Sequence, residues 1–229
     1  MQPIVLPDAA AAAQRGAALI AQQARAAIEE RGRFVLAVSG GATPRPMLVE
    51  LAEADVAWDR VRVVQVDERF APPGDAARNL TLLQETLLAY APLAPEHVYA
   101  MPVEASDPAA AAQGYARQLA QVAGTPPVID LVHLGLGADG HTASLVPGDA
   151  ALEVTDADVA VTGLYQGRQR MTLTYPIINR ARCILWLIAG KTKATMLERL
   201  CAGDTGIPAG RVAREQAVVL ADSEAAPDF

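Results

Sequence analysis

A histidine that directly follows a glycine-rich turn is the clearest chemical signal in the sequence. The turn spans Gly135–Gly140, follows an apolar run and leads into His141, with Asp139 two residues before the histidine. An imidazole that titrates near neutrality and is oriented by a carboxylate is well suited to act as a general base. The other histidines are weaker candidates, because His133 lies within an apolar run and His97 in a proline-bounded loop. We therefore expect His141 to activate a nucleophile.

A second signal, the segment Ser39–Pro44 with the sequence SGGATP, indicates an anion site. The glycine pair Gly40 and Gly41 allows close approach of the backbone to a ligand, and the following helix offers unpaired N–H groups and a partial positive charge to a phosphate. Ser39 and Thr43 add hydroxyl groups. The alternative interpretation of the same residues is a tight turn followed by a helix cap.

Further charged residues lie where other strands should end. Asp67 and Arg69 belong to a triplet of charges directly after an apolar run, and a solvated loop is the alternative for such a triplet. Arg170 and Lys193 belong to a basic group that also includes Arg168 and Lys191. Ordinary surface charge is the better interpretation of Arg168 and Lys191. Basic residues gathered at strand ends of an acidic chain suggest an anionic ligand.

Other chemistries fit these residues poorly. The turn formally matches the GxGxxG pattern of dinucleotide-binding proteins, but it lies in the middle of the chain and a histidine follows it at once, which would crowd a pyrophosphate. No second His or Cys lies near His141, so we expect no metal site. Ser144 is three residues from His141, but no GxSxG elbow surrounds it.

Apolar runs and turns alternate along the chain as in α/β proteins. Strands are expected at 34–38, 61–66, 129–134, 159–161, 171–175, 184–188 and, at a sheet edge, 218–220. Helices are expected at 9–31, from 44 to about 53, from a cap at Asn79, from a cap at Ser106 to about 122, and at 192–200. Continuous apolar strands are typical of a parallel sheet with helices on both faces, and ligands bind at the carboxyl ends of such strands. The candidate residues should therefore meet at one edge of a single domain spanning 1–229.

Composition limits the function further. The 229 residues carry a formal net charge of −7, which argues against a nucleic-acid-binding protein. The two cysteines do not form a CxxC pair, so neither a disulfide scaffold nor structural zinc is expected. No apolar run is long enough to span a membrane, and the first residues lack the layout of a signal peptide. We expect a cytoplasmic protein without nucleic-acid or membrane partners; its oligomeric state stays open, with a monomer favoured.

Several motifs taken together resemble one enzyme family. They are SGGATP, VDERF with Asn79 about ten residues on, GLGADGHTASLVPG, RMTLTYPIINRA and LIAGKTKATML, and they occur in order over nearly the whole chain. In this combination the sequence resembles the 6-phosphogluconolactonases. The resemblance implies a Rossmann-like α/β fold and hydrolysis of 6-phospho-D-glucono-1,5-lactone to 6-phosphogluconate, in the pentose phosphate pathway, with no cofactor.

The resemblance also implies roles for individual positions. His141 matches the catalytic histidine and Arg69 the arginine of the DER block. The phosphate loop corresponds to Ser39, Gly40, Gly41 and Thr43, and Arg170 and Lys193 would pair with the phosphate. Either Asp139 or Asp67 would orient the imidazole, and either Arg69 or N–H groups of a turn would stabilise the oxyanion.

Two other functions are compatible with the same blocks. The nearer is an aminosugar-phosphate isomerase or deaminase; those deaminases typically carry a glutamate five residues after the motif histidine, where this chain has Val146. The other is a non-catalytic sugar-phosphate sensor of the kind found in transcription regulators, which would normally carry a helix-turn-helix domain. The valine favours the lactonase.

Overall fold

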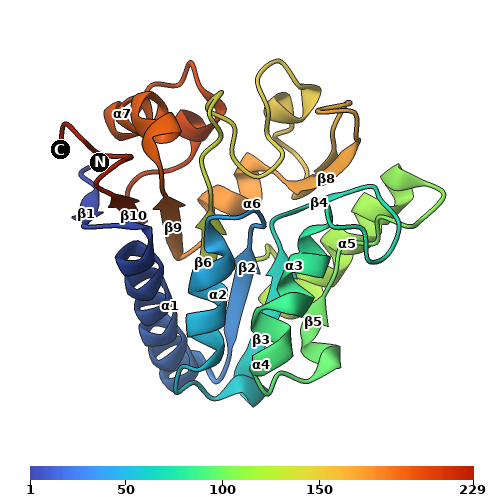
Figure 1. Cartoon of the computed structure of the whole chain (residues 1–229). Coiled ribbons are helices and arrows are strands. Elements are labelled where there is room, and N and C mark those ends of the chain that lie inside the picture. The colour runs from blue at the N-terminus through green and yellow to red at the C-terminus, as the bar shows by residue number, and fades with distance from the viewer.

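The core of the protein is a parallel β-sheet. The structure, a computed structural model, describes all residues 1–229. The seven strands of this sheet are β1 Ile4–Leu6, β2 Phe34–Val38, β3 Val61–Gln65, β5 Val98–Tyr99, β6 Leu131–Leu134, β9 Cys183–Ile188 and β10 Ala217–Asp222. They lie in the order β1-β10-β9-β6-β2-β3-β5, and every neighbouring pair is parallel (Figure 1).

Helices cover both faces of this sheet. Their bounds are α1 Ala9–Arg31, α2 Pro44–Ala52, α3 Asn79–Glu85, α4 Leu87–Tyr90, α5 Pro108–Ala123, α6 Tyr175–Asn179 and α7 Ala194–Ala202. Apolar residues of α1 to α4 form one buried cluster with one face of the sheet. Apolar residues of α5 to α7 form a second cluster with the opposite face. The predicted α/β class, with a mostly parallel sheet and helices on both faces, is therefore confirmed.

A small antiparallel sheet stands beside the carboxyl edge of the large one. It consists of β4 Asp67–Arg69, β8 Arg170–Leu173 and β7 Val159–Val161, with β8 in the middle. A single residue, Val66, separates β4 from β3, and its carbonyl accepts a hydrogen bond of 2.8 Å from the N–H of Leu173 in β8. The short sheet therefore continues directly from the large one.

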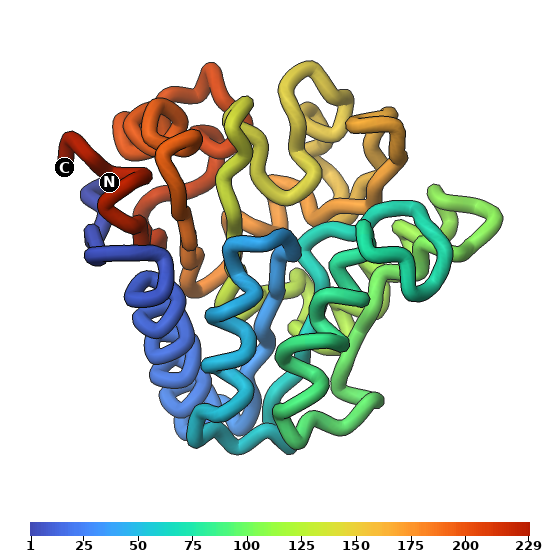
Figure 2. Tube along the Cα trace, viewed as in Figure 1, coloured from blue at the N-terminus to red at the C-terminus, as the bar shows by residue number.

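The first and last segments of the chain lie side by side (Figure 2). Strand β1 pairs in parallel with β10, and the Ser223 hydroxyl donates to the Pro7 carbonyl at 2.7 Å. Strand β10 therefore lies between β1 and β9, which corrects the prediction of an edge strand at 218–220. The edge is β1, whose three residues are too few to be recognised as a strand from periodicity.

Helix boundaries follow local capping chemistry. Helix α1 has the predicted bounds because the Asp8 carboxylate accepts the N–H of Ala11 at 2.8 Å and Gly32 ends the helix with a φ of 74°. The predicted caps at Asn79 and Ser106 are each displaced by one residue. Asn79 is the first residue of α3, and Asp107 caps α5 by accepting the N–H of Ala110.

The predicted strand at 159–161 forms, and the one predicted at 171–175 forms as Arg170–Leu173, because Tyr175 already begins α6. Both strands belong to the antiparallel sheet and not to the main one. None of the helices combines the length and apolar composition needed to cross a lipid bilayer.

Candidate active site

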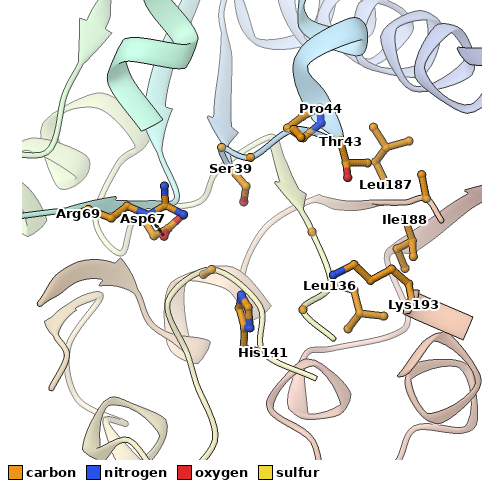
Figure 3. Close-up of a pocket in the computed structure, with 17 residues that line it drawn as sticks. Ser39, Thr43, Pro44, Asp67, Arg69, Leu136, His141, Leu187, Ile188 and Lys193 are labelled. Atoms are coloured by element: carbon orange, nitrogen blue, oxygen red, sulfur yellow. Dashed lines mark ion pairs between the residues drawn. The ribbon is translucent and has the colours of Figure 1, made fainter. Parts of the chain in front are cut away.

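A cavity of about 330 Å³ opens at the carboxyl edge of the large sheet. After β2, the strands β3 and β5 are added toward one edge of the sheet, and after β6, the strands β9 and β10 are added toward the other edge. The boundary between β2 and β6 is therefore a topological switch point. Ligands of open α/β sheets bind at such points. Side chains from separate turns point into this space (Figure 3). The lining residues are 39–44, Asp67, Arg69, 135–137, His141, Ala143, 187–189 and Lys193.

One wall of the cavity is the turn between β2 and α2. The backbone N–H groups of Gly40, Gly41, Ala42 and Thr43 donate to no other residue of the chain. Thr43 precedes α2, but its side chain makes no capping hydrogen bond, so its hydroxyl is available to a ligand. These donors, next to a helix N-terminus, suit an anion.

Ser39 anchors this turn. Its hydroxyl donates to the carbonyl of His133 at 2.9 Å and is buried, which ties the end of β2 to β6 across the switch point. Gly40 must be a glycine, because a Cβ there would lie 1.9 Å from Oδ1 of Asn79. The Asn79 amide in turn donates to the carbonyl oxygen of Asp67 at 2.8 Å and to its carboxylate at 3.0 Å. The anion wall is therefore fixed to the start of β4.

His141 lies opposite this wall, in the turn after β6 (Figure 3). Its Nδ1 contacts Oδ1 of Asp139 at 2.5 Å, and its backbone N–H donates to the same oxygen at 3.2 Å. Burial would raise the pKa of Asp139, but the hydrogen bonds from His141 outweigh it, so that pKa lies below its ordinary value. A proton on Nδ1 faces an ionised carboxylate, which leaves Nε2 as the basic nitrogen.

One glycine of this turn, Gly137, makes room for the contact between the two side chains. A Cβ on Gly137 would lie 2.0 Å from Nδ1 of His141 and 2.6 Å from Oδ1 of Asp139. The close approach of the histidine and its carboxylate to the backbone thus explains the glycine at position 137, whereas Gly140 has a φ of 83° and packs against Ile207.

Asp67 and Arg69 reach the cavity from β4. Asp67 is buried, and its Oδ2 accepts the hydroxyl of Ser144 at 2.6 Å. Arg69 donates to the carbonyl of Ala77 at 2.6 Å and places Nε 4.0 Å from Asp67. Of the two carboxylates proposed to orient His141, Asp139 therefore makes the contact, whereas Asp67 binds other partners. The alternative of a Ser144–His141 pair finds no support, because that serine is buried and donates to Asp67.

A buried carboxylate, Glu68, holds β4 in place. It is fully buried, accepts the backbone N–H groups of Arg69, Asn79 and Leu80 at 2.8 Å each, and lies 3.3 Å from the guanidinium of Arg78. A charge at this depth is tolerated because all of these donors face it. This anchor fixes the direction in which Arg69 leaves the strand.

The two predicted phosphate-pairing cations occupy different environments. Lys193 lines the cavity, and its ammonium group points into it (Figure 3). Arg170 is buried with 5% of its surface exposed and is not part of the cavity wall. It lies directly opposite Arg69 in the antiparallel sheet, and burial together with that like charge lowers its pKa. The structure therefore differs from the prediction of direct phosphate pairing by Arg170.

Sequence reasoning missed Tyr165, whose hydroxyl donates to Oδ2 of Asp139 at 2.9 Å. The tyrosine lies 24 residues from His141 in a segment with no recognisable motif, so only the spatial arrangement identifies it. Among His, Cys, Asp and Glu side chains, no group of three or more is arranged to hold a metal ion.

Known proteins resemble this chain in sequence and in fold. The sequence profile of the family described as "Glucosamine-6-phosphate isomerases/6-phosphogluconolactonase" matches residues 7–220. A 6-phosphogluconolactonase of a Nostoc species is 36% identical over 202 residues, which cover 86% of this chain and 84% of that protein. The solved 6-phosphogluconolactonase from Trypanosoma cruzi is similar with a TM-score of 0.89 at 26% identity, covering 100% of this chain and 97% of that one.

The fold is not limited to one activity. A structure described as a monomeric glucosamine-6-phosphate deaminase has a TM-score of 0.84 at 20% identity and covers 98% of each chain. Function must therefore be argued from the site rather than from the architecture.

Proposed function

The chain belongs to the glucosamine-6-phosphate isomerase/6-phosphogluconolactonase family, and we propose that it hydrolyses 6-phospho-D-glucono-1,5-lactone to 6-phosphogluconate, a step of the pentose phosphate pathway. The observation that carries the proposal is the placement of the His141–Asp139 pair across one cavity from the Ser39–Thr43 turn. Hydrolysis of a phosphorylated ester requires a base near the ester carbon and a site for the phosphate, and His141 and the Ser39–Thr43 turn can supply these two parts.

His141 acts as the base in this proposal. Asp139 holds the proton on Nδ1, so Nε2 takes a proton from a water molecule while the water oxygen bonds to C1 of the lactone. The carbonyl oxygen of the lactone becomes an oxyanion, for which Arg69 on the cavity wall supplies a positive charge. When the bond between C1 and the ring oxygen breaks, the protonated His141 returns its proton to that oxygen. The carboxylic acid product then ionises in water.

The phosphate lies at the other end of the cavity in this proposal. The unpaired N–H groups of the turn from Gly40 to Thr43 and the Thr43 hydroxyl donate to its oxygens. Lys193 adds a charge-assisted contact from across the cavity. Ser39 acts through the position of the turn, because its hydroxyl already donates to His133.

The deaminase alternative is disfavoured by one position. Val146, which stands five residues after His141, has only 4% of its surface exposed and packs in the interior. A valine cannot exchange a proton, whereas deamination of an aminosugar phosphate requires proton transfer at several atoms. Hydrolysis of a lactone requires a single base.

One assay tests the proposal. The purified protein is given freshly generated 6-phosphogluconolactone at constant pH, and the rate of acid release is corrected for spontaneous hydrolysis. We expect enzymatic turnover of the lactone and no ammonia release from glucosamine 6-phosphate under the same conditions. Ammonia release at an enzymatic rate, or lactone turnover no faster than the blank, would contradict it.

A further inference from the structure

Tyr165 contacts the catalytic pair from a different part of the chain. Its hydroxyl donates to Oδ2 of Asp139 at 2.9 Å and lies 3.5 Å from Nδ1 of His141. Its ring meets the imidazole edge to face, with centroids 5.5 Å apart. Because Oδ1 of Asp139 faces His141, the two carboxylate oxygens have separate partners. The carboxylate is thereby held at both ends.

A tight turn directs Tyr165 toward this contact. Tyr165 and Arg168 exchange two backbone hydrogen bonds of 3.0 and 3.2 Å across a two-residue loop. The loop residues Gln166 and Gly167 have φ angles of 53° and 76°. Two positive φ angles are typical of a two-residue hairpin, and a glutamine in that region is strained. Arg168 also pairs with Asp75 at 3.1 Å, which fixes the base of the turn.

Arg170 supports the tyrosine from behind. Its guanidinium lies over the Tyr165 ring at 4.8 Å from the centroid and donates to the side-chain oxygen of Gln166 at 3.2 Å. A cation over an aromatic face is an attractive contact that grows stronger away from water, and Arg170 is buried. Burial and the Asp139 carboxylate raise the pKa of Tyr165, so its hydroxyl keeps its proton and acts as a donor.

We propose that Tyr165 is a positioning residue for lactone hydrolysis, because its hydroxyl fixes Asp139 so that this carboxylate holds Nδ1–H of His141 and directs Nε2 into the cavity. The inference rests on the proposed function. Tyr165 acts through Asp139 and makes no bond to the reacting atoms.

The charged groups around His141 determine the expected effect. Asp139 lies in the same turn as His141, and Tyr165 contacts both from the segment before β8. Arg170 in β8 lies against the Tyr165 ring, and Lys193 and Arg69 line the same cavity as His141. When the tyrosine hydroxyl is removed, Asp139 loses the donor that fixes its second oxygen, so it holds Nδ1–H of His141 less firmly. The tautomer of His141 whose basic Nε2 faces the cavity is then less populated.

The first test compares Tyr165→Phe, which keeps the ring over Arg170, with the control Tyr90→Phe, whose tyrosine is 64% exposed in α4. For Tyr165→Phe we expect kcat on 6-phosphogluconolactone to fall about tenfold, in line with the loss of one hydrogen bond to a charged group. KM should stay within about twofold. Tm should be unchanged. Tyr90→Phe should match the wild type throughout.

A second measurement keeps the inference testable even if the lactone is not the substrate. Long-range ¹H–¹⁵N NMR spectra report the tautomer of each of the three histidines, and substitutions of His97 and His133, one at a time, assign the signals. Tyr165→Phe should increase the population of the His141 tautomer that is protonated at Nε2, because Asp139 then holds Nδ1–H less firmly. An unchanged tautomer, or an unchanged kcat with an active wild type, would overturn the positioning role. An inactive wild type with the expected NMR shift would overturn the proposed function alone.

Discussion

The two ends of the cavity are constructed in different ways. The anion end consists of main-chain N–H groups of one short segment, Gly40–Thr43, together with the ammonium group of Lys193. The histidine end depends on side chains from separate parts of the chain, with His141 and Asp139 in one turn and Tyr165 in another. The main-chain donors of the anion end require only the correct backbone path, whereas the histidine end requires several side chains to be placed correctly relative to one another.

This difference explains what each end tolerates. Main-chain donors survive most side-chain substitutions, but the path of the turn depends on Gly40, where a Cβ would collide with Asn79. At the histidine end, the removal of a single oxygen atom changes the hydrogen bonding of Asp139. We therefore expect substitutions at the anion end to change substrate binding, and those at the histidine end to change the chemical step.

The largest effect is expected at His141. His141→Ala should remain folded but lose about 10²- to 10⁴-fold in kcat, the usual contribution of a general base. The control is His97→Ala, because His97 lies outside the cavity, in the short 3-10 helix before β5. Steady-state rates on 6-phosphogluconolactone and circular dichroism of both variants check the prediction. Wild-type turnover by His141→Ala would rule out the mechanism.

Substitutions of Lys193 and Arg170 should have different effects, because the two residues support different ends of the cavity. Lys193→Ala should lose about 1.5–3 kcal/mol of binding to the phosphorylated lactone, as expected for one charge-assisted contact, and little on gluconolactone without phosphate. Arg170→Ala should reduce kcat on both lactones, since Arg170 is buried behind Tyr165 and does not line the cavity.

Relative kcat/KM values on the two substrates provide the measurement. A loss confined to the phosphorylated lactone in Arg170→Ala would restore that residue to the phosphate site.

A smaller effect concerns the sheet beneath the anion end, where His133 lies in β6 with no hydrogen-bond partner for either ring nitrogen. Burial lowers the pKa of His133 from 6.5 to about 4. As the pH falls below 6.5, the unfolded chain binds a proton that the folded chain does not, so the free energy of unfolding decreases until about pH 4. Between pH 8 and pH 5 this loss should be about 2 kcal/mol.

Urea unfolding of the wild type and of His133→Leu at both pH values isolates this contribution, because the other titrating groups are the same in the two proteins. The variant should lose less stability on acidification. An identical pH dependence in both proteins would show that His133 is not held neutral by burial.

Much of the fold could be predicted because it follows from local chemistry. The bounds of α1 depend on Asp8 and Gly32, and the strand at 34–38 is a continuous apolar run. Strand β4 could not be predicted, because its three residues are all charged and it forms only by pairing with β8, about a hundred residues later. The same tertiary pairing moved the predicted strand at 171–175 into the second sheet.

The candidate site divides in the same way. Residues within one turn, such as Asp139 and His141, could be grouped from their spacing, and the structure brings them into contact. The partner of Asp67 could not be inferred, because Ser144 is 77 residues away. Arg170 is the first residue of the motif RMTLTYPIINRA, but a motif does not reveal whether a side chain faces a cavity or the interior, and Arg170 is buried.

A double-mutant cycle with His141→Ala and Lys193→Ala tests the division between the two ends most directly. The kcat/KM values of the wild type, both single variants and the double variant are measured on 6-phosphogluconolactone. If the two ends act separately, the losses in transition-state stabilisation should add to within about 0.5 kcal/mol. On gluconolactone without phosphate, Lys193→Ala should have almost no effect in either background. A coupling well above that limit, or equal effects of Lys193→Ala on both lactones, would contradict the assignment of the base to one end and the phosphate to the other.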